Sequence, residues 1–200
     1  MLDLPTDIAA DLAPLSWLLG VWEGPGFLDY TAGDTRFSGE FTHRVSFSHD
    51  GGDHVNYSAD AWTTGPAGDR IPLVSEVGFW RLARPALDTD AGPALLPPRA
   101  AGPARRADDV EALRNAAGGF DIQAQIVHSD GVGELYLGQV KGPRVDLATD
   151  AVVRTAGARE YAAATRMYGL VEGDLLWAWD IAALGTELRS HASARLVRAP

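Results

Sequence analysis

From Trp22 onward, apolar and β-branched residues recur in short runs that are separated by turn residues. Such runs are typical of β-strands, and helical periodicity is weak almost throughout the chain. The pattern predicts about ten strands, near residues 22–30, 37–48, 54–63, 71–82, 120–128, 132–140, 144–154, 160–171, 175–183 and 188–198. Their even spacing favours an all-β fold, an antiparallel up-and-down β-barrel, over the alternative of a β-sandwich.

Three of the connections between these runs have the composition of tight hairpin turns. They are Asp50-Gly51-Gly52-Asp53, Ser129-Asp130-Gly131 and Glu172-Gly173-Asp174. Hairpins join antiparallel neighbours, so these turns support a barrel in which consecutive strands pair.

The strand pattern begins at Gly20-Val21-Trp22-Glu23-Gly24-Pro25-Gly26. Gly20, Gly24 and Gly26 together with Pro25 exclude a regular helix here. Glycine beside a large indole is typical of places where two backbones, or a backbone and a ligand, approach closely. We expect this stretch to begin the first strand, with Trp22 largely buried. A short N-terminal helical plug, formed by the apolar residues 12–19, is expected to close that end of the barrel.

Residues 84–119 interrupt the regular succession of predicted strands with a segment rich in Ala, Pro and Arg. The segment has too little apolar content to bury anything, so we expect a flexible insertion within a single domain that spans residues 1–200. Residues 108–115 are compatible with one or two helical turns. The insertion is interpreted as a tolerated surface excursion, and the alternative is a lid over a cavity mouth.

Composition and charge narrow the function further. The 200 residues are 46% hydrophobic and carry a formal charge of −10, which argues against nucleic acid and anionic membrane surfaces as partners. No run of 18 apolar residues indicates a membrane span, and the acidic N-terminus does not resemble a signal peptide. Without cysteine the chain has no disulfides and no thiolate ligands. We therefore expect a cytoplasmic protein.

The histidines are the main candidates for metal or cofactor chemistry, and no two of them have the spacing of a zinc motif. His43 alternates with Thr42 and Arg44, which suggests that it faces solvent. His49 and His54 flank a turn, where imidazole often caps the backbone, and His128 ends a strand. For these four a structural role is favoured.

His191 differs because it opens the last strand and is followed by Ala192, Ser193 and Ala194. These small residues leave space for a bulky ligand beside the imidazole. A neutral imidazole there could bind a single iron axially, with a planar macrocycle filling the barrel mouth. An equally good explanation is that His191 lies at the barrel mouth and forms a hydrogen bond with a neighbouring loop.

Several motifs resemble those of the nitrobindin family, a family of haem-binding β-barrels. The resemblance rests on the Gly-X-Trp-X-Gly-X-Gly stretch of residues 20–26 and on the order and spacing of further segments across nearly the whole chain outside 84–119. Those segments are Phe47-Ser48-His49, Val77-Gly78-Phe79-Trp80-Arg81, Val127 to Glu134, Arg166-Met167-Tyr168 and Ile181 to His191.

The resemblance implies that the protein binds ferric haem b with His191 as the proximal iron ligand and an open sixth position. It also implies that Arg159 pairs with a haem propionate and that Ala32 lies in the loop that borders haem. Ser190 and Ala192 replace the Pro and Leu that usually flank the ligand histidine.

Members of this family convert peroxynitrite to nitrate by capture at Fe(III), cleavage of the O–O bond and recombination, and they can bind nitric oxide. A homodimer is one assembly that the resemblance allows. The competing hypothesis is a non-enzymatic carrier that holds a fatty acid or another apolar ligand in the same cavity.

Overall fold

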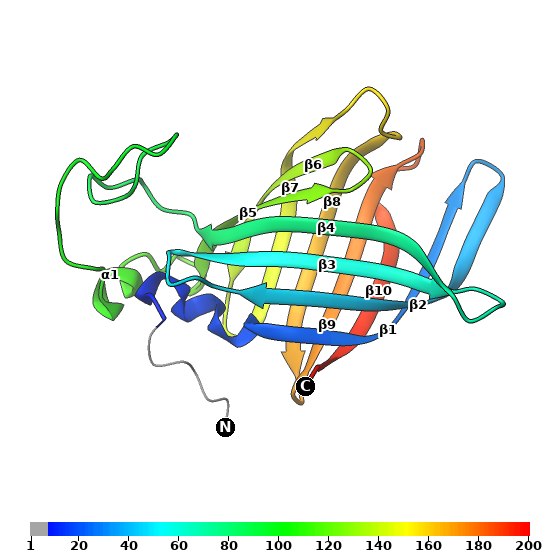
Figure 1. Ribbon diagram of the computed structural model, residues 1–200, viewed down its shortest axis with the longest axis horizontal. Helices are drawn as coiled ribbons and strands as arrows, with labels where there is room; N and C mark the ends of the chain where they lie inside the picture. The colour runs from blue at the N-terminus through cyan, green and yellow to red at the C-terminus, as the bar shows by residue number, and fades with distance from the viewer. Residues whose placement is uncertain (1–7) are drawn as a thin grey trace.

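The computed structural model, which describes residues 8–200, is a closed barrel of antiparallel strands (Figure 1). Each strand pairs with its neighbours in the chain, and the first strand closes the barrel against the last. The strands are β1 (Gly20–Ala32), β2 (Thr35–Ser48), β3 (His54–Thr64), β4 (Arg70–Leu82), β5 (Phe120–His128), β6 (Val132–Val140), β7 (Arg144–Arg154), β8 (Tyr161–Val171), β9 (Asp174–Ala183) and β10 (Arg189–Arg198). The predicted up-and-down barrel is confirmed, and no strand boundary differs from its prediction by more than two residues.

The turn chemistry agrees with the hairpins that were predicted. Gly131 has a φ of 94°, and Glu172 and Gly173 have φ values of 54° and 90°. Two consecutive residues with positive φ are what a type I′ hairpin requires, and its twist matches the twist of the flanking strands.

One end of the barrel is closed by the 3₁₀ helix η1 (Ala10–Leu18), as the sequence predicted. The side chains of Leu12, Leu15 and Leu18 are fully buried in the core. Trp22 is 1% exposed, and its Nε1 donates a hydrogen bond of 2.7 Å to the carbonyl of Leu18. None of the helices in residues 8–200 is long and apolar enough to cross a membrane.

The glycines of β1 serve close packing. A Cβ atom at Gly24 would collide with the carbonyl oxygen of Arg195 on β10, and one at Gly26 would enter the ring of Phe41 on β2. The expectation that this stretch brings two backbones close together is confirmed at Gly24, because only a residue without Cβ fits against the neighbouring strand.

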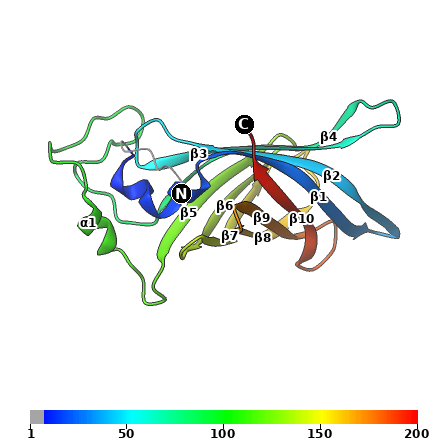
Figure 2. The ribbon, with the colours of Figure 1, turned by 90° about the horizontal axis from the view of Figure 1, so that it is seen from below.

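The segment 84–119 leaves β4 at the plugged end, where its short helix α1 (Ala107–Glu111) contacts η1 (Figures 1 and 2). The expectation that it buries nothing is wrong, because Val110 is 4% exposed within the core. The guanidinium of Arg84 bonds to Asp11 of η1 at 3.2 Å and to Asp90 at 2.7 Å. The apolar packing of Val110 and Leu113 and the ion pair between Arg84 and Asp11 therefore attach the segment to the plug.

Candidate functional site

A cavity of about 240 Å³ lies toward the end of the barrel opposite η1. Most of its lining is apolar and aromatic, including Leu28, Phe41, Val74, Trp177, Trp179 and Ile181. The polar side chains among the lining residues are fewer, and they include His43, Glu76, His128, Arg159 and His191. An apolar cavity with a few convergent polar groups is the usual form of a small-molecule site. Segment 84–119 contributes no residue to this lining, so the structure does not support its interpretation as a lid.

His191 lines this cavity from the start of β10. Its Nδ1 is buried and has no hydrogen-bond partner. Burial lowers the pKa of His191 to about 4, so the imidazole is neutral near pH 7 and keeps a lone pair for a ligand. The sequence explained His191 equally well as an iron ligand and as a residue hydrogen-bonded to a neighbouring loop. Among the described residues, the structure shows no hydrogen bond from this ring to a neighbouring loop.

His43 lines the same cavity from β2, and its prediction as a solvent-facing residue is wrong. The side chain is 2% exposed, and its ring lies 4.4 Å from that of Trp177. Nδ1 is 3.2 Å from the carbonyl oxygen of Asp60, which can only accept, so Nδ1 carries the proton and Nε2 presents a lone pair without a partner. Burial lowers the pKa of His43 to about 4.

Buried polar atoms without partners are concentrated around this cavity. Five of the eight such side-chain atoms among the described residues belong to cavity-lining residues, namely His43, Tyr161, Trp177, Trp179 and His191. Because folded proteins pair nearly all of their buried polar groups, unpaired donors and acceptors gathered at one cavity point to a ligand that is not part of the chain.

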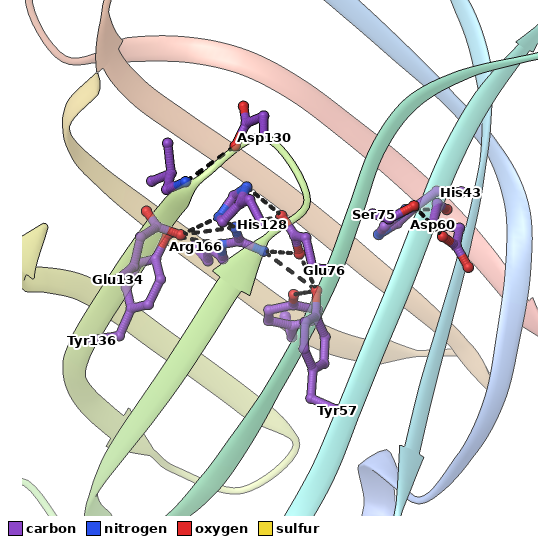
Figure 3. Close-up of polar contacts among 12 residues, drawn as sticks. His43, Tyr57, Asp60, Ser75, Glu76, His128, Asp130, Glu134, Tyr136 and Arg166 are labelled. Carbon is purple, nitrogen blue, oxygen red and sulfur yellow. Dashed lines mark hydrogen bonds and ion pairs between the residues drawn. The ribbon is translucent and has the colours of Figure 1, made fainter. Parts of the chain in front are cut away.

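The inner wall of the cavity includes part of a buried ion network made of Glu76, His128, Glu134 and Arg166 (Figure 3). Arg166 donates to the two carboxylate oxygens of Glu76 at 2.7 and 2.8 Å, and its Nη2 lies 3.2 Å from Glu134. His128 Nε2 is 2.7 Å from Glu134. The side chain of Arg166 is fully buried, and bidentate pairing of this kind offsets part of the cost of burying charge.

Tyrosines surround the buried ion network and complete its hydrogen bonding. Tyr57 donates to Glu76 at 2.7 Å, and Tyr136 donates to Glu134 at 2.7 Å. Burial would raise the pKa of Glu76, but the Arg166 guanidinium outweighs it and holds that pKa at about 2. Both carboxylates of the network are therefore ionised near pH 7, since the pKa of Glu134 is also lowered.

The remaining predicted site residues are distributed over the molecule. Arg159 is exposed and lines the cavity, whereas Ala32 ends β1 and is not a lining residue. Gly20, Trp22, Gly24 and Gly26 do not line the cavity either; their described contacts are packing contacts near the plug and along β1.

The other two histidines, His49 and His54, do not line the cavity. His49 Nδ1 accepts a hydrogen bond from the backbone N–H of Gly51 at 3.3 Å, which confirms the predicted cap. His54 begins β3, and its Nδ1 lies 3.5 Å from a carboxylate oxygen of Asp53.

Sequence reasoning missed the buried ion network, although a signal for it existed. Along a strand, residues two apart share a face. Glu134 lies two residues from the buried Val132 and Tyr136 and therefore shares their face of the strand. Arg166 likewise shares a face with the buried Ala164 and Tyr168. A charged residue in phase with an apolar face is the signature of a buried, paired charge.

Comparisons with known proteins agree with this fold. Residues 11–198 match the family described as THAP4-like, heme-binding beta-barrel domain. A protein named Peroxynitrite isomerase from Leifsonia xyli subsp. xyli is 60% identical over 199 residues, covering all of both chains. Another of that name from Clavibacter michiganensis subsp. michiganensis is 59% identical and covers 98% of each chain. The crystal structure of Rv2717c from M. tuberculosis superposes with a TM-score of 0.69 at 25% identity, covering 97% of this chain and 100% of that one.

Proposed function

Because the chain belongs to the THAP4-like haem-binding β-barrel family, also known as the nitrobindin family, we propose that it is a haem-dependent peroxynitrite isomerase. The observation that carries this proposal is the neutral, partly buried imidazole of His191 at an apolar cavity. Relatives that carry the name Peroxynitrite isomerase match the whole chain at up to 60% identity, which supports the same activity here.

The residues present fit a haem group. Iron binding requires an unprotonated imidazole nitrogen, and burial keeps His191 neutral near pH 7. Nδ1 of His191 is buried, so Nε2 is the nitrogen left to bind iron. Phe41, Trp177 and Trp179 supply the aromatic lining that a flat macrocycle needs. The exposed Arg159 offers its guanidinium to a propionate.

When bound, ferric haem b would supply the Lewis-acidic iron that the isomerisation of peroxynitrite to nitrate needs. The chain would contribute the imidazole of His191 to hold the iron, and an apolar wall that excludes water. Absence of cysteine removes the most readily oxidised side chain from the reaction. His43 Nε2 can accept a hydrogen bond from a protic ligand inside the cavity but cannot donate one, because its only N–H faces Asp60.

The same cavity suits nitric oxide, a small neutral molecule that binds haem iron without needing a charged partner. We place the protein in the cytoplasm, in keeping with its lack of cysteine and its acidic charge.

A homodimer is also part of the proposal. Val77 of β4 lies opposite Val127 of β5, and both side chains are more than half exposed. Phe79 and Val153 extend this apolar strip on the outside of the barrel. Contiguous exposed apolar side chains of this kind mark interaction surfaces. Sedimentation of the protein and of a Val127→Lys variant tests the assembly, and an unchanged monomer in both would exclude it.

The activity is tested by mixing the hemin-loaded protein with peroxynitrite and measuring the rate of peroxynitrite decay and the yield of nitrate. We expect faster decay and a higher nitrate yield than with buffer, and neither effect with His191→Ala. A fatty-acid probe run in parallel tests the competing carrier function. Binding of that probe with no response to hemin would contradict the isomerase and support the carrier.

A further inference from the structure

His191 occupies an irregular position in the sheet. Ser190 pairs with Asp180 of β9 and Ala192 pairs with Trp179, so His191 between them has no partner of its own in the ladder. A β-bulge of this kind re-aims a side chain and is common beside active sites. The direction of the imidazole is therefore not fixed by strand pairing alone.

The usual support for a metal-binding histidine is also missing. Such a histidine almost always donates its second ring N–H to a carboxylate or a carbonyl, which fixes the orientation of the ring. In this structure Nδ1 of His191 is buried without any partner. Some other contact must hold the ring.

Two aromatic rings provide that contact. The ring of Tyr30 lies 4.4 Å from the His191 ring at an angle of 36°, and the ring of Trp179 meets it edge-on at 5.4 Å and 82°. Tyr30 is itself stacked on Phe37, at 5.0 Å and 18°. Tilted and edge-to-face pairs at these distances are favourable.

Tyr30 belongs to a part of β1 that extends past the barrel wall. The last pair between β1 and β10 is Leu28 with Ala192, whereas β1 and β2 remain paired as far as Ala32 with Thr35. Arg189 ties this two-stranded extension to β10 by donating to the carbonyl of Thr31 at 2.8 Å. The hairpin thus brings Tyr30 against His191 from outside the closed sheet.

We propose that Tyr30 and Trp179 are positioning residues that orient the His191 imidazole by ring packing, in place of the usual hydrogen bond to Nδ1. This inference rests on the proposed role of His191 as the iron ligand. Tyr30 is the residue to test, because Trp179 also lies beneath the Arg166 guanidinium at 4.6 Å and its loss would disturb the buried ion network.

The first measurement uses the apoprotein and does not depend on haem. Proton–carbon NMR correlations of the His191 imidazole, assigned with His191→Ala, report the ring current of Tyr30. We expect Tyr30→Leu to shift these signals and to remove the contacts from Tyr30 to His191, and Tyr30→Phe to preserve them. Phe27→Leu is the matched control, because Phe27 lies on the same strand but is exposed. Melting curves establish that each variant is folded.

The second measurement is the hemin affinity of the same variants, from the Soret absorbance. We expect Tyr30→Leu to weaken hemin binding about 10-fold, the scale of losses on removing support from a metal ligand. Tyr30→Phe and Phe27→Leu should stay within about twofold of the parent, well below that scale. Unchanged His191 signals and unchanged affinity in Tyr30→Leu would overturn the positioning role. Unchanged affinity in His191→Ala would instead overturn the proposed function, and the apoprotein spectra would still decide whether Tyr30 orients the ring.

Discussion

The two ends of the barrel differ in how many of their buried polar atoms lack a hydrogen-bond partner. At the plugged end, the indole N–H of Trp22 is bonded to Leu18, and the guanidinium of Arg84 is bonded to Asp11. At the open end, polar atoms of His43 and His191 are buried without partners, as are three more around the cavity. Three more unpaired atoms, on Trp80, Arg81 and Arg105, belong to residues outside the cavity lining, toward the plugged end. Unpaired buried polar atoms are thus more numerous around the cavity, as expected of an end that binds a ligand.

Because of this difference, we expect the residues that stabilise the fold and the residues that bind a ligand to lie in different regions of the barrel. Substitutions at the plug should lower the free energy of unfolding and leave ligand affinity unchanged. Substitutions of unpaired groups at the cavity should affect ligand affinity more than stability. The buried ion network lies between the two regions, and it is where the largest effect on stability is expected.

Replacing Arg166 with Leu should produce that largest effect. The change leaves the carboxyl groups of Glu76 and Glu134 buried in the core without their guanidinium partner. We expect a loss of about 5 kcal/mol, the upper end of the range for breaking a buried ion pair. Urea unfolding at pH 7 measures it. A triple variant with Glu76→Gln and Glu134→Gln added should recover part of the loss, and no recovery would show that packing rather than charge dominates.

Replacing Trp22 with Ala tests the plug. The side chain is fully packed and supplies one hydrogen bond, so its removal leaves a large cavity. We expect a loss of about 4 kcal/mol, within the range for deleted core aromatics. Trp22→Phe keeps most of the packing and should lose much less. Unchanged melting of Trp22→Ala would contradict the role assigned to the plug.

The pH dependence of stability tests the unpaired histidines. The pKa of His43 is about 4 in the folded protein, below its ordinary value of 6.5, so the unfolded chain binds more protons between these values. Stability is therefore full above pH 6.5 and falls as the pH drops toward 4, by on the order of 1–2 kcal/mol for this histidine at pH 5. His43→Phe should show a shallower fall than the parent. Equal slopes would mean that His43 is not buried in its neutral form.

Replacing Val110 with Ala should have the smallest effect. Two buried methyl groups are lost where segment 84–119 meets the plug, which corresponds to about 1.5 kcal/mol. Hemin affinity should not change, because Val110 does not line the cavity. A change in hemin affinity without a change in stability would contradict this expectation and show that packing of the segment against the plug affects ligand binding at the open end.

The sequence predicted the strands well because their signals are local. Turn residues such as Gly131 and Gly173 adopt positive φ, and each marks a hairpin without reference to the rest of the chain. His43 was misjudged from its neighbours Thr42 and Arg44, which lie on the opposite face. Phe41 and Val45, two residues away on either side, share its face and are buried. The burial of His43 is therefore indicated by the residues two positions away, which share its face, and not by its nearest neighbours.

Other features depend on contacts that no local pattern encodes. Arg166 on β8 meets Glu76 on β4 across the barrel interior, 90 residues apart in sequence. The bulge at His191 and the approach of Tyr30 depend on how β10, β9 and β1 are aligned in the closed sheet. Such juxtapositions require the three-dimensional arrangement of the strands.

The most direct test of the central claim is a Soret titration of the parent protein, His191→Ala and His49→Ala with hemin. His49 serves as the control because it lies in a loop outside the cavity lining. The parent and His49→Ala should bind hemin and give the same ferric spectrum, whereas His191→Ala should lose or strongly shift that spectrum and remain folded. Equal binding and identical spectra in all three proteins would contradict the claim that the open end of the barrel is built around His191 to hold haem.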